Sequence, residues 1–287
     1  MGTLGHQHAR ISPTAHYTAY VWYRAGMSFA PLATPLGRAL HVALRPMNRA
    51  YERLGTRPDL DMMLLARHRV LDAWLEAEIA SGRVGQVLEI AAGLSPRGAT
   101  FVRRHPGLVY IEGDLPDMAA DKRRRLAGAG LLAEGHRIVT LDALAAEGPT
   151  SLAEVAAREL DPERGLAIVT EGLLSYFDLA AVRGMWARFA TLLARHGSGA
   201  YLADLNLAGD LAGMRSGLVF RRLLEVFARG RVHLHFEGEA EARAALALAG
   251  FDDVELRTPQ EVAGVDVPGR DRRHVVRLLR ARATRAG

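Results

Sequence analysis

Four acidic residues recur at matching points of the sequence, each within or after a short apolar run. Glu89 lies in VLEIA, Asp114 follows LVYIEG, Asp142 follows RIVTL and Glu171 follows LAIVT. Charged side chains are rarely buried without a partner, so core packing does not account for all four. Helix capping explains one or two of them, and Asp114 is the clearest case because it precedes Pro116. The pattern favours one polar site assembled from several segments.

A turn of small residues accompanies these acids. Residues 87–98, VLEIAAGLSPRG, predict a strand followed by a tight turn at Ala91, Ala92 and Gly93. Small residues let a ligand approach the backbone, as in nucleotide-binding α/β sheets, and an acid such as Asp114 after the next strand suits ribose hydroxyls. The segment lacks a strict G-x-G-x-x-G pattern, so on its own a plain strand-to-helix turn explains it equally well.

Alternating strands and helices are expected to position these residues. The predicted strands are 87–91, 108–112, 137–141, 166–170 and 200–205, and the predicted helices between them include 116–132, 151–159 and 179–195. This alternation is typical of a parallel sheet with helices on both faces. The carboxyl ends of parallel strands share one edge, where ligands bind.

The two ends of the chain add to this pattern. A helix is predicted from Leu60 to Ile79, with Asp59 or Asp61 as its cap. A helix over 240–249 precedes two further strands, 254–257 and 274–279. A parallel sheet that ends in an antiparallel hairpin fits the α/β, Rossmann-like class I methyltransferase fold.

Composition excludes several classes of protein. Hydrophobic residues make up 49% and charged residues 24% of the 287 residues, as in ordinary globular proteins. The absence of cysteine excludes disulfides, a cysteine nucleophile and thiolate metal sites. The net charge is +5, but the arginines are scattered, so no nucleic-acid partner is predicted.

Localisation and metal binding are also predicted from the sequence. The first ten residues lack the apolar core of a signal peptide, and no apolar run is long enough to span a membrane. A cytoplasmic protein without membrane contact is expected. His233 and His235 alternate in VHLHF without a third ligand at a suitable spacing, so no metal site is predicted.

Six segments together resemble the leucine carboxyl methyltransferase-like family of S-adenosylmethionine-dependent enzymes, which includes bacterial polyketide O-methyltransferases. They are LLARHRVLD (64–72), VLEIAAGLSPRG (87–98), YIEGDLPDMAADKRRRL (110–126), LDAL (141–144), TEGLLSYF (170–177) and YLADLNL (201–207). The resemblance covers roughly residues 13–280. It implies S-adenosylmethionine as the cofactor.

The resemblance assigns roles by position. Arg67 corresponds to the arginine that holds the cofactor's carboxylate, a group that suits an arginine fork. Asp114 corresponds to the ribose ligand, and Asp142 with Ala143 to the adenine contact. Glu171 corresponds to the acid that faces the cofactor's amino group. The cofactor-binding set is therefore predicted as Arg67, Glu89, Ala91, Gly93, Asp114, Asp142, Ala143 and Glu171.

The remaining candidates concern the reaction. Tyr176 corresponds to a tyrosine near the reacting centre, where its ring can face a sulfonium; a core aromatic packed on Phe177 is the alternative. Arg97 is interpreted equally as a second carboxylate or substrate contact, or as a charge on a helix surface. His16 is a candidate catalytic base if a lid closes over the site. The predicted catalytic residues are Tyr176, Glu171 and His16, and the predicted substrate-side residues are Tyr17, Tyr20, Trp22, Arg97 and Asp204.

Two domains are expected. Residues 1–80 form a helical lid and a lead-in helix, and aromatic residues gather between Ser12 and Tyr23. Residues 81–287 form the Rossmann-like, S-adenosylmethionine-binding domain, with a helical insertion at about 206–237. No prediction of the oligomeric state is made.

The expected function is methyl transfer to a carboxylate or hydroxyl of a small molecule in secondary metabolism. A carboxylate is ionised at neutral pH and needs no base, and no dedicated base is evident in the sequence, which favours a carboxylate acceptor. The alternative is a methyltransferase-fold enzyme that cyclises S-adenosylmethionine itself to azetidine-2-carboxylate and methylthioadenosine.

Overall fold

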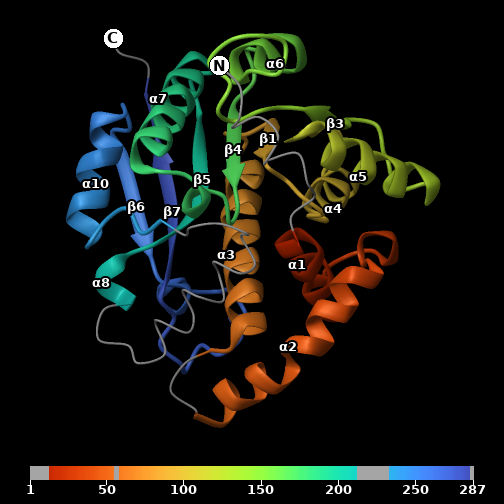
Figure 1. Ribbon diagram of the computed structural model, residues 1–287. Helices are drawn as coiled ribbons and strands as arrows, with labels where there is room; N and C mark the ends of the chain where they lie inside the picture. The colour runs from red at the N-terminus through yellow and green to blue at the C-terminus, as the bar shows by residue number, and fades with distance from the viewer. Residues whose placement is uncertain (1–12, 55–57, 212–232, 285–287) are drawn as a thin grey trace, which may run out of the picture.

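The computed structural model describes residues 13–54, 58–211 and 233–284. A seven-stranded sheet with the order β3-β2-β1-β4-β5-β7-β6 forms its centre (Figure 1). The parallel strands are β1 (Gln86–Ile90), β2 (Val109–Asp114), β3 (His136–Thr140), β4 (Leu166–Thr170) and β5 (Gly199–Asn206). β7 (Val276–Arg282) runs antiparallel to β5 and to β6 (Asp253–Arg257). The predicted α/β fold, a parallel sheet ending in an antiparallel hairpin, is confirmed.

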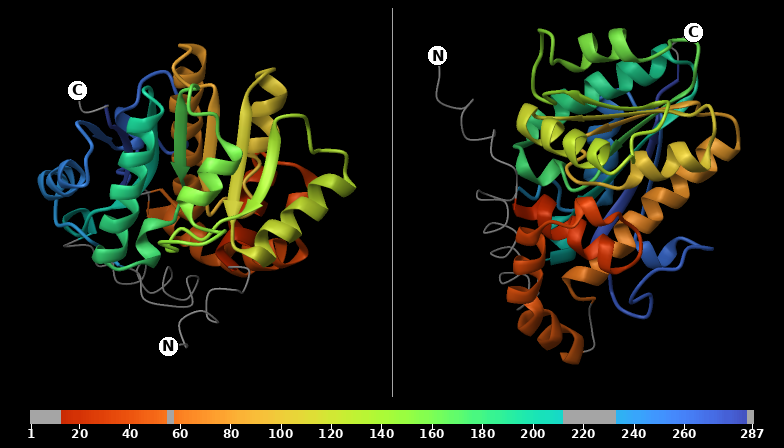
Figure 2. Two further views of the ribbon diagram at one scale, coloured as in Figure 1. Left: turned by 90° about the horizontal axis from the view of Figure 1, so that it is seen from above. Right: turned by 90° about the vertical axis from the view of Figure 1, so that its right-hand side faces the viewer.

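Helices cover both faces of the sheet (Figure 2). α3 (Leu60–Ala80) and α4 (Arg97–Arg104) pack on one face, where Val87 and Val169 point. α6 (Leu152–Glu159), α7 (Leu179–Arg195) and α10 (Glu239–Leu248) pack on the other, where Leu88 and Ile168 point. Successive strand residues face opposite sides and helices cover both faces, so all of β1 is buried, including the polar Gln86 and Glu89.

The N-terminal helices lie at the carboxyl edge of the sheet. α1 (Pro13–Arg24), the 3₁₀ turn η1 (Ala30–Leu32) and α2 (Pro35–Leu54) gather beside α3, and the β4 arrow points toward them (Figure 1). Tyr17, Val21 and Leu64 form an apolar contact between α1 and α3. α3 also packs along the sheet, so it joins the N-terminal helices to the sheet.

Several element boundaries differ from those expected. Asp59, not Asp61, caps α3, because its Oδ1 accepts the backbone N–H of Met62 at 2.8 Å. The helix predicted over 116–132 is α5 (Pro116–Gly128); it ends early, and Gly130 follows with φ +64°. The strand predicted over 274–279 is β7, which begins at Val276 and runs to Arg282 because β5 and β6 both pair with it.

The predicted insertion at 206–237 lies largely outside the described residues. The described part contains α8 (Ala208–Leu211) and a segment from residue 233 that is neither helix nor strand before α10 begins. Within the described ranges, every helix is too short or too polar to cross a membrane.

A buried ion pair fastens α5 to the sheet. Lys122 is the only lysine in the chain, and its Nζ lies 2.7 Å from Oε2 of Glu112 on β2. His136 Nε2 lies 3.3 Å from the same oxygen. Burial raises the pKa of Glu112, but the charges and hydrogen bonds of Lys122 and His136 outweigh it and bring that pKa down to about 2. Glu112 is therefore ionised at neutral pH.

We expect Lys122→Met to lower the free energy of unfolding by about 3–5 kcal/mol at pH 7, because it leaves a buried carboxylate without its cation. The folded-state pKa of Glu112 is depressed, so the wild-type contribution is full above the unfolded pKa near 4.5 and is lost as the pH falls toward 2. Denaturant unfolding at pH 7 and pH 3 measures both effects.

The control is the double variant Glu112→Gln/Lys122→Met, which removes both charges and should recover much of the lost stability. A Lys122→Met protein as stable as the wild type at pH 7 would contradict this account of the pair.

Candidate functional site

The turn after β1 is fastened to the end of β2. Ala91 has φ +55° and Gly93 has φ +50°, so the chain reverses through the left-handed region, which a residue with a side chain rarely adopts. Asp114 Oδ2 accepts the N–H of Gly93 at 2.7 Å, and its Oδ1 accepts the N–H of Leu115 at 2.7 Å. The N-cap of α5 is Leu115, so the capping explanation for Asp114 is wrong. Burial raises the Asp114 pKa, and the two N–H donors oppose that effect.

Glu171, the first residue after β4, is the centre of a buried ionic network. Its Oε1 accepts from Arg67 Nε at 2.9 Å. Its Oε2 lies 2.8 Å from His68 Nδ1 and 2.6 Å from Arg97 Nη2. Burial raises the Glu171 pKa, but His68 and the two arginines outweigh it and hold that pKa well below its ordinary value. We call these residues, with the carboxylates that pair with the arginines, the Glu171 network.

Arg67 joins Glu171 to a second acid, Asp204 on β5. Arg67 Nη1 donates to Asp204 Oδ2 at 3.1 Å, and the N–H of Gly172 donates to Asp204 Oδ1 at 2.6 Å. Gly172 has φ +69°, and an added Cβ would lie 3.2 Å from both terminal nitrogens of Arg67. A glycine after Glu171 therefore lets the arginine lie against the backbone.

Arg97 is enclosed by three acids. Its Nε donates to Asp72 Oδ1 at 2.5 Å, its Nη1 to Glu89 Oε1 at 2.5 Å, and its Nη2 to Glu171. Glu89 also accepts from the hydroxyl of Tyr110 at 2.8 Å. The Arg97 side chain is 0% exposed, so its interpretation as a helix-surface charge is wrong. Glu89 therefore contacts Glu171 only through Arg97, which bonds to both carboxylates.

His68 and Asp72 belong to this network, and Tyr110 bonds to its Glu89, but all three residues are absent from the sequence-based candidates. His68 and Asp72 lie in the quoted segment LLARHRVLD, four residues apart on α3, with 3.5 Å between their polar atoms. Residues four apart share a helix face, and Arg67 lies beside that face. The spacing therefore indicated that His68 and Asp72 lie together, although it did not identify the other residues that each of them contacts.

One aromatic residue of α1, Trp22, reaches the network. The Trp22 ring lies 4.3 Å from the His68 ring, and the buried Trp22 Nε1 has no hydrogen-bond partner in the described part of the chain. Tyr17 instead donates to Asp61 at 2.5 Å, and Tyr20 lies 5.4 Å from His41. His16 Nδ1 is 2.8 Å from Thr34 Oγ1. The structure thus places Trp22 near Glu171 and ties the other three residues into contacts between the N-terminal segments.

The last two candidates lie on the loops that follow β3 and β4. Asp142 follows β3, and its Oδ1 accepts the N–H of Leu144 at 2.9 Å, which shapes the turn at Ala143. Tyr176 ends the 3₁₀ turn η2 (Leu174–Tyr176) and is partly exposed. Phe177, not Tyr176, packs against the main apolar core.

No group of three or more histidine, aspartate or glutamate side chains is arranged to hold a metal ion in the described ranges. His233 and His235 stack with 6.0 Å between ring centroids. His235 Nε2 donates to the backbone carbonyl of Phe177 at 2.6 Å.

Comparison with known proteins identifies the family. The model of the leucine carboxyl methyltransferase family matches residues 28–190, which include α3, the turn after β1 and Glu171. The chain belongs to this family. S-adenosylmethionine is accordingly its cofactor.

Individual relatives agree with this assignment. A Mycobacterium bovis protein, named as an S-adenosyl-L-methionine-dependent methyltransferase, is 33% identical over 111 residues, which are 39% of this chain and 35% of that protein. The aligned segment thus spans about a third of the relative's length. A Thermobifida fusca crystal structure described as a methyltransferase aligns over 95% of both chains, with 14% identity and a TM-score of 0.66. A DUF574 family protein from Streptomyces avermitilis aligns over 96% of this chain and 98% of its own, with 16% identity and a TM-score of 0.64. These two structures share the fold.

The residues at the sheet edge fit the cofactor of the family. Its amino-acid end carries a carboxylate and an amino group, and the Glu171 network presents a cation and an anion side by side. The Arg67 side chain is 15% exposed, and its Nη2 makes no hydrogen bond within the described ranges, whereas Arg97 is 0% exposed. Of the two arginines, Arg67 is therefore the one with a donor left for a ligand.

We expect Asp114→Asn to weaken S-adenosylmethionine binding by about 1–3 kcal/mol, because it removes a charged acceptor from the hydrogen bonds proposed for the ribose hydroxyls. Isothermal titration calorimetry gives the affinity, and thermal unfolding shows whether the variant is folded. Asp117→Asn is the matched control, since Asp117 lies in the first turn of α5 and is exposed. Unchanged affinity in a folded Asp114→Asn protein would remove Asp114 from the site.

Proposed function

We propose that this chain transfers a methyl group from S-adenosylmethionine to the carboxylate of a small organic acid. The observation that carries the proposal is the Glu171 network at the carboxyl edge of the sheet, with Arg67 as its accessible arginine. S-adenosylmethionine supplies an electrophilic methyl group on a sulfonium. The protein's task is then to align the donor and the acceptor and to exclude water.

The assignment of the binding residues follows the polar groups along the edge. Arg67 holds the carboxylate of the cofactor, and Glu171, kept ionised by its cationic neighbours, accepts from the amino group. Asp114 accepts from ribose hydroxyls, and the turn at Asp142 and Ala143 borders the adenine. Glu89 and Arg97 are positioning residues, since both side chains are buried and paired.

The state of the acids favours a carboxylate acceptor over a hydroxyl. Glu171 is a weak base because its pKa is lowered, and Asp204 is bonded to Arg67 and to the N–H of Gly172. Burial, with the charge of Arg125, lowers the pKa of His16, whose Nδ1 is bonded to Thr34. A phenol or alcohol needs a base to accept a methyl group, whereas a carboxylate is already ionised at neutral pH.

The direct test follows the fate of the cofactor by mass spectrometry, first with S-adenosylmethionine alone and then with a panel of carboxylic acids and matched alcohols. We expect S-adenosylhomocysteine and a methyl ester only when an acid is present. Methyl ethers from the alcohols would make the acceptor a hydroxyl. Methylthioadenosine formed without any acceptor would instead support cyclisation to azetidine-2-carboxylate.

Tyr176 is proposed to face the sulfonium. A cation over an aromatic ring gains about 0.5–2 kcal/mol, which the neutral thioether of S-adenosylhomocysteine does not gain. We expect Tyr176→Phe to keep the preference for S-adenosylmethionine over S-adenosylhomocysteine and Tyr176→Leu to lose that amount of it. Calorimetry with both ligands measures the ratio of affinities.

Phe177→Leu is the matched control, because Phe177 packs on the core. It should lower the melting temperature and leave the ratio of affinities unchanged. If Tyr176→Leu behaves in the same way, Tyr176 is a packing residue and not part of the site.

A further inference from the structure

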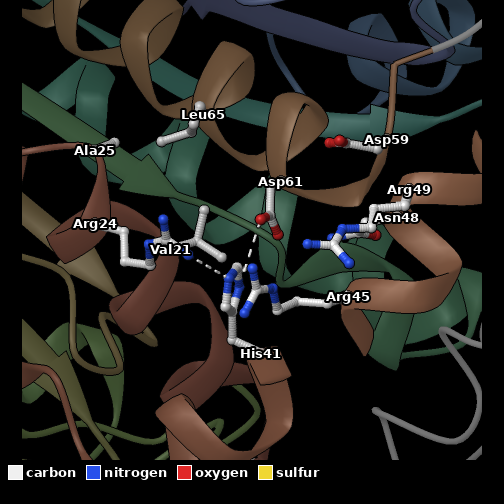
Figure 3. A pocket seen from close by; sticks show the side chains of 10 residues that line it. All are labelled: Val21, Arg24, Ala25, His41, Arg45, Asn48, Arg49, Asp59, Asp61 and Leu65. Carbon is white, nitrogen blue, oxygen red and sulfur yellow. Dashed lines mark hydrogen bonds and ion pairs between the residues drawn. The ribbon is translucent and has the colours of Figure 1, made fainter. Parts of the chain in front are cut away.

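A pocket opens between α1, α2 and α3, and no residue of the Glu171 network lines it (Figure 3). Its volume is about 280 Å³. Val21, Ala25 and Leu65 give it an apolar wall. Arg24, Arg45 and Arg49 contribute three guanidinium groups. The pocket is therefore amphipathic, with its positive charge on α1 and α2.

The two acids in this pocket are engaged within the protein. Asp59 caps α3 through its bond to Met62. Asp61 Oδ1 accepts from the Tyr17 hydroxyl at 2.5 Å, and Asp61 Oδ2 lies 3.4 Å from His41 Nδ1. These contacts tie the first turn of α3 to α1 and α2.

His41 continues this chain of contacts as a neutral ring. Arg24 Nη1 donates to His41 Nε2 at 2.9 Å, so the ring proton is on Nδ1, which faces Asp61. Burial and the charges of Arg24 and Arg45 lower the pKa of His41, against the opposing effect of Asp61. Arg24 is thus bonded to a neutral partner, and its positive charge is not cancelled.

Arg45 and Arg49 lie one helical turn apart on α2, and their guanidinium groups extend into the pocket beside His41 and Asp61 (Figure 3). Neither forms an ion pair with a carboxylate in the part of the chain that the structure describes. A further unmatched group lies beside them, because the buried Asn48 Oδ1 has no hydrogen-bond partner among the described residues.

We propose that this pocket binds a small organic anion, a carboxylate or a phosphate monoester. The anionic group lies on Arg45 and Arg49, whose planar forks match two oxygens of either group. The apolar body of the anion packs against Val21, Ala25 and Leu65. This site is separate from the methyl-transfer site.

The test is calorimetric titration of the full chain, without S-adenosylmethionine, using hexanoate, hexyl phosphate and neutral hexanol as probes. We expect at least one of the two anions to bind and hexanol not to bind. The double variant Arg45→Ala/Arg49→Ala should weaken anion binding about tenfold or more, the scale of one lost charged hydrogen bond. Both side chains are exposed, so the fold is expected to survive, and circular dichroism verifies this.

The charge-matched control is Arg183→Ala/Arg195→Ala, because both arginines are exposed on α7, which packs on the sheet. It should bind the anion as the wild type does. Binding of hexanoate alone or of hexyl phosphate alone identifies which anionic group the pocket accepts. Failure of both anions to bind, equal weakening in the control, or unchanged binding in Arg45→Ala/Arg49→Ala would overturn the proposal. Because no step requires methyl transfer, the result is independent of the proposed function.

Discussion

The arrangement of the site depends on an ionised carboxylate, Glu171, buried where β4 ends. A buried carboxylate is costly unless cations and hydrogen-bond donors surround it. Those groups come from two helices: Arg67 and His68 from α3, and Arg97 from α4. Neither helix can shift against β4 without leaving a buried charge unpaired. One electrostatic requirement therefore fixes three elements that are distant in sequence.

The two arginines that bond to Glu171, Arg67 and Arg97, differ in burial and therefore in role. All three guanidinium nitrogens of Arg97 are bonded to acids. Its Nε donates to Asp72, its Nη1 to Glu89 and its Nη2 to Glu171. A planar guanidinium can meet three acids at once, which a lysine ammonium does less well. Arg67 lies nearer the surface and keeps one terminal nitrogen unbonded in the described part of the chain. The inner arginine holds the network together, and the outer one remains available to a ligand.

Helix α1 connects the two candidate sites because successive helical residues point in different directions. Trp22 lies on His68 of the Glu171 network, whereas the adjacent Val21 lines the basic pocket. Tyr17 and its bond to Asp61 hold α1 to α3 between these two contacts. Any displacement of α1 would change both surfaces, so occupancy of the basic pocket would stabilise the helix that carries Trp22.

Local sequence was sufficient for most elements of this fold. Apolar runs such as LAIVT can be recognised as strands from local sequence, because a parallel strand is buried on both faces and is therefore apolar along its whole length. The acids that follow these strands were also visible, since a charge after an apolar run interrupts a clear pattern. The pairing of the acids was not visible. Glu89 and Glu171 occupy similar positions in the sequence pattern. In the structure Glu89 pairs with the buried Arg97, whereas Glu171 pairs with both Arg97 and the more exposed Arg67. Charges pair according to their distance in space, and α3 brings Arg67 to Glu171, a residue 104 positions away.

The pocket lined by Arg24, Arg45 and Arg49 is also a product of the tertiary structure. In the sequence these are three scattered arginines, and only the packing of α1 and α2 against α3 places their charges around one cavity.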